Sequence, residues 1–251
     1  MKEAYTHLAQ FYDLLMDEDY QAWASYLLDL AEEAGISPKR ILELGCGTGN
    51  LSLALAACGM EVVGVDISPE MIRGAQEKAG IQGLALDFRV QDMRELHFPD
   101  QRWEIAIAAC DAMNYLTTAH DFCLALQAVH RHLEDGGVFF FDLNSEAKLR
   151  ELYGNNSFAD LHDDFAYFWD NSFDEQEETC IMELTFFVQG GSGAYHRVQE
   201  RHVQKLWRPE TVAEFLEQTG FELIGCYGFM TMEQPSDDCE RWQFAAKKAL
   251  R

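Results

Sequence analysis

Up to Asn144, the apolar residues fall into two alternating patterns. Five short apolar runs, each bounded by polar or turn residues, are typical of buried strands: residues 40–44, 61–66, 84–90, 103–109 and 137–143. Helical spacing or helix-start residues predict helices at 19–35, at 51–58, from Ser68 onward and at 119–133. Strands that alternate with helices indicate parallel strands joined by helical crossovers, so we expect a doubly wound α/β sheet.

After Ser145 the pattern changes to aromatic-rich segments separated by turn residues. These segments span residues 165–171, 180–189 and 195–206. We expect them to form an antiparallel meander inserted after the fifth strand, with Gly190–Gly193 as its strongest turn signal. A helix and two strands are predicted last, at 208–218, 221–227 and 241–247.

Acidic residues outnumber basic ones: 43 Asp and Glu against 19 Lys and Arg give a formal net charge of −24. Such a surface repels phosphate backbones, and the basic residues form no stripe, so we do not expect a nucleic-acid partner. A hydrophobic content of 48% excludes a disordered chain. The longest apolar runs have six residues, whereas about 20 are needed to cross a bilayer, so we expect no membrane segment.

Seven cysteines, an odd number without a Cys-x-x-Cys pair, are spread along the chain, and several lie inside apolar runs. This distribution is typical of free thiols in a reducing compartment. The first residues also lack the apolar core of a signal peptide, so we expect a cytoplasmic protein. The histidines form no His-Glu-x-x-His motif, and we expect no bound metal.

A glycine-rich loop, Gly45-Cys-Gly47-Thr-Gly49, lies between a predicted strand and a predicted helix. Glycines there allow a tight turn and let a ligand approach bare backbone at a helix N-terminus. The spacing is GxGxG, whereas dinucleotide-binding loops have GxGxxG, and Asn50 takes the third glycine's place. Glu43 would repel a pyrophosphate but suits a cationic group, which favours an amino-acid-bearing nucleoside. The alternative is a tight turn without a ligand.

Two acidic residues follow the next strands. Asp66 ends the second strand, where a carboxylate can accept hydrogen bonds from both ribose hydroxyls, and Asp92 follows the third, where an acceptor can bind an adenine amino group. Ligands of open α/β sheets lie beyond the carboxyl ends of the strands, where these side chains are expected. The alternatives are a helix-capping acid before Ser68 for Asp66 and a solvated loop charge for Asp92.

Three stretches together resemble the motifs of class I S-adenosylmethionine-dependent methyltransferases. They are Ile-Leu-Glu-Leu-Gly-Cys-Gly-Thr-Gly-Asn at 41–50, Val-Asp-Ile-Ser-Pro-Glu-Met at 65–71 and Gln-Asp-Met at 91–93. The resemblance extends over residues 38–144 and the Thr-Gly-Phe-Glu step at 219–222. Residues 5–13 and the meander resemble a bacterial subgroup of small methyltransferases whose substrate is unsettled.

The resemblance implies S-adenosyl-L-methionine as the cofactor. It also implies a Rossmann-like, seven-stranded, mostly parallel sheet with the antiparallel β insertion after the fifth strand. On this pattern residues 1–251 form one methyltransferase domain. Its expected parts are an N-terminal helical lid (1–35), a cofactor-binding core (36–144), a lid or meander insertion (145–206) and a C-terminal helix with the last two strands (207–251).

The family pattern also implies which residues bind the cofactor. Gly45, Cys46, Gly47 and Gly49 would line its methionine portion, with Glu43 near the amino group. The other implied contacts are Asp66 with the ribose, Ile67, Asp92 and Met93 with the adenine, Cys110 with the sulfonium end, and Tyr12 as a cover from the N-terminal segment.

Methyl transfer from a sulfonium is an in-line displacement that requires positioning more than acid–base chemistry. Asp111, after the fourth strand, is the best candidate for a general base, and a loop acid or helix cap is an equal alternative. The segment after that strand lacks the Asn/Asp-Pro-Pro-aromatic motif of family enzymes that methylate base amines. Cys110 follows Ala109, whereas the nucleophilic cysteine of base C5-methylating enzymes follows proline.

These absences and the acidic charge favour a small-molecule methyl acceptor. Methylation of RNA or protein, and a catalytically silent cofactor-binding module, remain alternatives; a dinucleotide oxidoreductase would need the missing third glycine. Aromatic side chains of the meander either wall an acceptor pocket or pack in the sheet. We expect His196, Arg197 and His202 at the surface, although each could also receive an anionic group.

Overall fold

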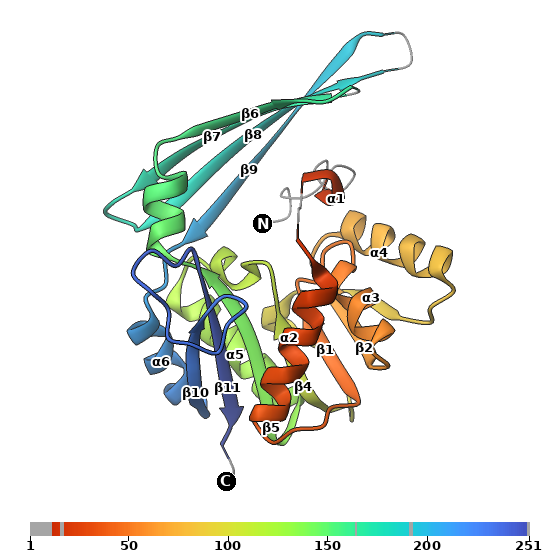
Figure 1. The fold of residues 1–251 in the computed structure, drawn as a ribbon, viewed down its shortest axis with the longest axis vertical. Helices are drawn as coiled ribbons and strands as arrows, with labels where there is room; N and C mark the ends of the chain where they lie inside the picture. The colour runs from red at the N-terminus through yellow and green to blue at the C-terminus, as the bar shows by residue number, and fades with distance from the viewer. Residues whose placement is uncertain (1–11, 16–17, 164, 191–192, 250–251) are drawn as a thin grey trace.

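Two β-sheets organise the chain in the computed structural model, which describes residues 12–15, 18–163, 165–190 and 193–249 (Figure 1). The larger sheet has seven strands in the order β10-β11-β5-β4-β1-β2-β3. Their bounds are β1 Arg40–Leu44, β2 Glu61–Asp66, β3 Asp87–Val90, β4 Trp103–Ala108, β5 Leu133–Asn144, β10 Phe221–Gly228 and β11 Arg241–Lys248. Strands β1 to β5 pair in parallel, and β11 is antiparallel to both of its neighbours. The predicted seven-stranded, mostly parallel sheet is confirmed.

Helices cover both faces of this sheet, as a doubly wound fold requires. The longer ones are α2 Tyr20–Glu33, α3 Asn50–Ala57, α4 Pro69–Gln82, α5 Ala119–His132 and α6 Pro209–Gln218. Strand β5 shows how the two faces are built, because its side chains alternate. Phe139 and Phe141 pack in the cluster with α5 and α6, whereas Phe140 packs in the cluster with α2 and α3.

Short helical turns lie on the side of the larger sheet where its parallel strands end. They are α1 Tyr12–Leu15, η2 Met93–Glu95, η3 Ala112–Tyr115 and the π-helical segment η4 Ala147–Tyr153. No helix in the described residues is long and apolar enough to cross a membrane.

The second sheet is antiparallel, follows β5 and lies above the larger sheet in Figure 1, in the order β6-β7-β8-β9. Its strands are β6 Ser157–Leu161, β7 Phe165–Asp174, β8 Thr179–Gln189 and β9 Tyr195–Lys205. Alternate residues of β8, including Met182, Leu184 and Phe186, are buried on the inner face. The predicted insertion is confirmed.

Candidate active site

The loop after β1 turns through left-handed backbone. Gly45, Gly47 and Gly49 have φ of 63°, 53° and 79°. A Cβ at Gly45 would lie 2.8 Å from the Cβ of Ala112, and one at Gly49 would lie 2.9 Å from that of Ala75. Glycine is therefore required at both positions by conformation and by space, independently of any ligand.

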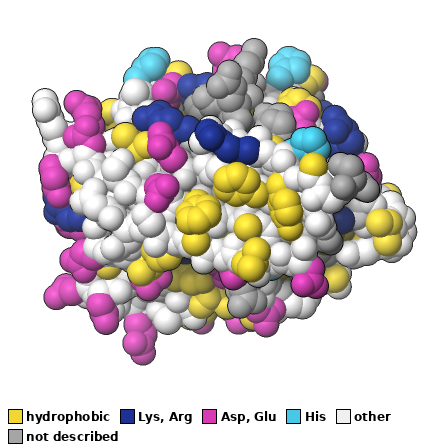
Figure 2. Space-filling view, turned by 90° about the horizontal axis from the view of Figure 1, so that it is seen from above, with side chains coloured by type: hydrophobic (Ala, Val, Ile, Leu, Met, Phe, Trp, Pro, Cys, Tyr) yellow, Lys and Arg dark blue, Asp and Glu magenta, His cyan; other side chains and the backbone are white. Residues whose placement is uncertain are grey.

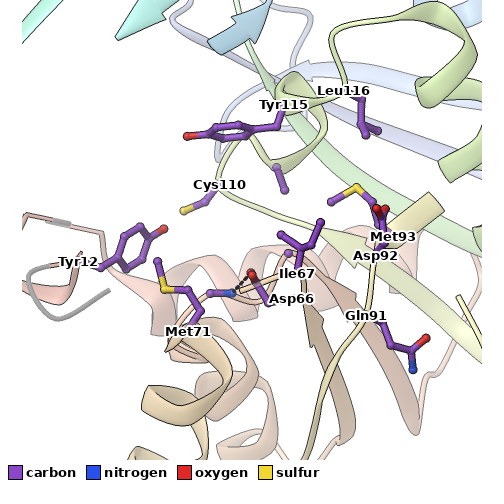
Figure 3. A pocket seen from close by; sticks show the side chains of 13 residues that line it. Tyr12, Asp66, Ile67, Met71, Gln91, Asp92, Met93, Cys110, Tyr115 and Leu116 are labelled. Atoms are coloured by element: carbon purple, nitrogen blue, oxygen red, sulfur yellow. Dashed lines mark hydrogen bonds between the residues drawn. The ribbon is translucent and has the colours of Figure 1, made fainter. Parts of the chain in front are cut away.

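Asp66, at the end of β2, holds this loop in place. Its carboxylate accepts a hydrogen bond from the backbone N–H of Gly47 at 2.9 Å, drawn as the dashed line in Figure 3, and another from the N–H of Ser68 at 2.8 Å. Burial raises the pKa of Asp66, although these backbone donors oppose the rise. The Asp66 carboxylate thus starts the turn into α4 and also faces a cavity. The two interpretations from the sequence, a helix-capping acid and a ribose-binding acid, are therefore compatible.

A cavity opens beside the loop. Eight of the residues that the sequence assigned to the cofactor line it: Tyr12, Gly45, Gly47, Asp66, Ile67, Asp92, Met93 and Cys110. Five lining residues were not predicted: Met71, Gln91, Ala112, Tyr115 and Leu116. Of these, Met71 lies within the Val-Asp-Ile-Ser-Pro-Glu-Met stretch, which could have identified it.

The cavity fits S-adenosylmethionine. Gly47 lines it with bare backbone, and a Cβ there would lie 3.8 Å from the nearest atom of the Tyr12 ring. The Asp66 carboxylate also lines the cavity, where it can accept hydrogen bonds from ribose hydroxyls. Apolar side chains such as Ile67 and Met93 supply surface for a flat base (Figure 3).

Asp92 lines the cavity, but it is also strongly paired. Its carboxylate accepts hydrogen bonds from the Arg94 backbone N–H at 2.9 Å and from the Arg94 guanidinium at 2.6 Å, and Arg94 also pairs with Asp121. Partial burial alone would raise the pKa of Asp92, but the Arg94 donors outweigh it, and the pKa is lowered. Asp92 therefore stays ionised and remains an acceptor.

Glu43, Cys46 and Gly49 are not among the residues that line the cavity. Cys46 packs in a buried cluster with Phe88. Glu43 is buried and accepts a hydrogen bond from the Ser52 hydroxyl. The pKa of Glu43 is raised to about 8, mainly because the side chain is buried. The hydrogen bond from Ser52 opposes this rise, and the nearby Asp66 carboxylate adds to it. Direct cofactor contacts by these three residues stay predictions.

The raised pKa of Glu43 predicts a pH-dependent stability difference. The folded protein favours the protonated acid, so this group destabilises the fold as the pH rises from about 4.5 towards about 8. We expect Glu43→Gln to match wild type near pH 5 and to be more stable by about 1–3 kcal/mol near pH 8.5. Urea unfolding at both pH values measures this. A variant less stable than wild type at the higher pH would contradict it, and Glu61→Gln, at an exposed position, is the matched control.

A second cavity adjoins the first beneath the second sheet. The two share Tyr12, Cys110 and Tyr115, and in Figure 3 the Tyr12 hydroxyl points towards the Cys110 sulfur, while that sulfur and the Tyr115 hydroxyl point towards the side on which Tyr12 lies. Burial raises the pKa of Cys110 to about 12. The other residues that line it are Leu15, Glu18, Asp111, Lys148, Tyr153, Trp169, Met182, Leu184, His202, Gln204 and Arg241.

Asp111 lines the second cavity and not the first. It has φ of 54°, as does Cys110, a conformation that non-glycine residues rarely adopt and that is frequent at functional sites. One carboxylate oxygen of Asp111 accepts hydrogen bonds from the side-chain amides of Asn144, at 2.8 Å, and Gln204. The role of Asp111 as a base stays a prediction.

The expectation that His202 lies at the surface was wrong. His202 and Gln204 are buried on the inner face of β9, whereas His196 and Arg197 are exposed as expected. The sequence signal that could have shown this is the strict alternation along β9, which places 200, 202 and 204 on one face.

Comparison with known proteins agrees with this geometry. A family model described as "Methyltransferase domain" matches residues 41–137. The "Putative methyltransferase YqeM" of Bacillus subtilis (strain 168) is 36% identical over 98% of this chain and 97% of its own length. A crystal structure of an S-adenosylmethionine-dependent methyltransferase from Clostridium acetobutylicum ATCC 824 has a TM-score of 0.87 and 29% identity, covering 97% of this chain and 98% of that one.

A more distant structure, of the S-adenosylmethionine-bound amino pentose methyltransferase CalS10 from Micromonospora echinaspora, has a TM-score of 0.74 at 19% identity, covering 99% of this chain and 100% of that one. It shares the fold. The chain belongs to the class I S-adenosylmethionine-dependent methyltransferase family. Its activity is methyl transfer, and S-adenosylmethionine is its cofactor.

Proposed function

We propose that the protein methylates a small polar molecule that binds in the second cavity. The observation that carries this proposal is the boundary between the two cavities. A methyl donor in the first cavity and an acceptor in the second would meet at Tyr12, Cys110 and Tyr115. S-adenosylmethionine supplies a methyl group that is already activated by its positive sulfur. The residues of the chain therefore need mainly to align the two molecules and exclude water.

The lining of the second cavity supports a polar acceptor. Glu18 and Asp111 contribute carboxylates, and Lys148 and Arg241 contribute positive charge, among aromatic side chains. A site with fixed polar groups of both signs suits a small molecule with several hydrogen-bonding groups. The amino pentose named for CalS10 is one such molecule, although that likeness extends to the fold alone.

The surface does not favour a nucleic acid. The net charge is −24. On the face of Figure 2 a group of hydrophobic side chains lies at the centre, with acidic and basic side chains mixed around it. A phosphate backbone would find no continuous basic track on this face.

The N-terminal segment and the cellular location complete the proposal. Tyr12 of α1 lines both cavities, which supports a covering role for this segment; residues 5–11 of the quoted opening lie outside the described residues. Helix α2, in contrast, packs in the core through Trp23 and Leu27. All seven cysteines are free thiols, in keeping with a reducing cytoplasm.

The test compares acceptor fractions. Purified protein and S-adenosylmethionine are incubated with the low-molecular-mass, RNA and protein fractions of a bacterial extract, and S-adenosylhomocysteine is measured. We expect it to accumulate with the low-molecular-mass fraction alone. Accumulation with RNA or protein alone would contradict the proposal. A protein that binds S-adenosylhomocysteine but consumes no methyl donor with any fraction would instead be a silent binding module.

A further inference from the structure

Three polar side chains, two of them buried, form a hydrogen-bonded row that ends at the boundary of the two cavities. Oε2 of Glu200 lies 3.2 Å from Nε2 of His202, and Nδ1 of His202 lies 3.2 Å from the hydroxyl of Tyr115. The side chains of His202 and Glu200 are only 2% and 1% exposed. The row joins β9 of the second sheet to η3 of the larger one.

This row and Gln204 place polar side chains of β9 against a face that is apolar on β8. The row's β9 members pair across the sheet with apolar residues of β8: Glu200 with Leu184 and His202 with Met182. A carboxylate and an imidazole buried there are costly to desolvate unless they are hydrogen-bonded. Polar residues that break the local pattern of a sheet face are most often found at functional sites.

Tyr115 carries the row to the place where the methyl group would be transferred, because it lines both cavities. The other two shared residues are poor bases. Burial raises the pKa of the Cys110 thiol to about 12 and that of the Tyr12 phenol well above its ordinary value. Asp111 lines only the acceptor side.

We propose that Tyr115 takes the proton from the methyl acceptor, and that His202 and Glu200 are positioning residues that receive and stabilise that proton. This inference rests on the proposed acceptor cavity. The acceptor's nucleophilic atom bonds to the methyl carbon as the carbon–sulfur bond breaks, and that bond's electron pair stays on sulfur. The acceptor's proton passes to the Tyr115 oxygen while the tyrosine's own proton passes to Nδ1 of His202. The resulting imidazolium lies against the Glu200 carboxylate and later releases its proton to water.

The row therefore identifies the chemical class of the acceptor. A base is useful only when the nucleophilic atom still carries a proton at neutral pH, as in a hydroxyl or a protonated primary or secondary amine. A thiol that is already ionised would not need it.

The first test needs no acceptor. Nitrogen-15 NMR of the histidine-labelled protein, with S-adenosylhomocysteine bound, reports which ring nitrogen of His202 carries a proton, and His202→Gln assigns the signals. We expect the ring proton on Nε2, with Nδ1 accepting the hydrogen bond from Tyr115. Glu200→Gln should change the nitrogen-15 shift of Nε2 of His202 while leaving S-adenosylhomocysteine affinity unchanged. A proton on Nδ1, in a neutral ring or an imidazolium, would overturn the proposal because His202 could not then accept one from Tyr115.

The second test uses kinetics with the active low-molecular-mass fraction. Tyr115→Phe should lower kcat by about 10²–10⁴-fold, the range of general-base catalysis, with little change in KM for S-adenosylmethionine. His202→Gln and Glu200→Gln should lower kcat less, again with KM preserved. The matched controls Tyr195→Phe, His196→Gln and Glu183→Gln change exposed residues of the same sheet and should be neutral. An unchanged kcat in Tyr115→Phe would overturn the proposal, whereas failure of wild type to bind S-adenosylhomocysteine would overturn the cofactor site itself.

Discussion

Replacing Asp66 by alanine should weaken the binding of S-adenosylhomocysteine by at least about tenfold, equivalent to about 1.4 kcal/mol. The variant loses the carboxylate that faces the first cavity and can accept bonds from ribose hydroxyls. It also loses the bonds that hold the backbone of Gly47 and Ser68, so the loop around the ligand becomes less ordered. Isothermal titration calorimetry on wild type and variant measures the difference directly.

Three controls make this result specific. Asp87→Ala removes an exposed carboxylate at the opposite end of the neighbouring strand β3 and should leave affinity unchanged. Asp66→Asn keeps one acceptor oxygen and should fall between wild type and Asp66→Ala. NADH, a dinucleotide, should not bind. If Asp66→Ala bound S-adenosylhomocysteine as tightly as wild type, the assignment of this cavity to the cofactor would be wrong.

The larger sheet could be predicted because its strands carry their own signal. The runs that became β2 and β4 are buried on both faces, so they read as short apolar segments between polar ones. The signal of the glycine-rich loop is also local. Three of its five residues have left-handed backbone, which favours glycine at those positions whether or not a ligand binds. Asp66 and Asp92 could be predicted as site residues because each stands at or just after the end of a strand.

Other elements carry little local signal. Strand β6 is almost entirely exposed and pairs only with β7, so its sequence shows no apolar alternation, and it was missed. Strand β3 begins at Asp87, not at the predicted residue 84. Leu86 lies within the predicted range but precedes β3. Its side chain packs against a buried apolar cluster that includes Phe88 and Ile72, so in the sequence it resembles a strand residue.

The second cavity could not be predicted from the sequence because its residues come from distant segments. Tyr115, Lys148, His202 and Arg241 belong to four different elements and meet only after the second sheet folds over the first. No spacing along the chain encodes that meeting. The cofactor cavity, by contrast, is built mostly from the loops that follow consecutive strands.

Arg241→Met should destabilise the fold by about 3–5 kcal/mol near neutral pH, because it leaves a buried carboxylate without its partner. Arg241 is buried, and its guanidinium lies 3.5 Å from Asp142 and 3.4 Å from Glu18, with Trp23 and Phe229 against its faces. Burial raises the pKa of Asp142 to about 6; Arg241 lowers that pKa, and Asp111 raises it. Methionine preserves much of the packing volume but none of the charge. Chemical denaturation of both proteins measures the loss.

The pH dependence and a double variant separate charge from packing. Without Arg241 the pKa of Asp142 must rise above about 6, so the folded variant holds its proton to higher pH than wild type does. The stability gap should therefore be largest near pH 8 and should shrink near pH 5, where Asp142 is protonated in both folded proteins. Adding Asp142→Asn to Arg241→Met should recover most of the loss at pH 8, because no buried charge then remains unpaired. A gap that is constant with pH and is not reduced by the second substitution would mean that Arg241 stabilises the fold through its contacts with Trp23 and Phe229 and not through its charge.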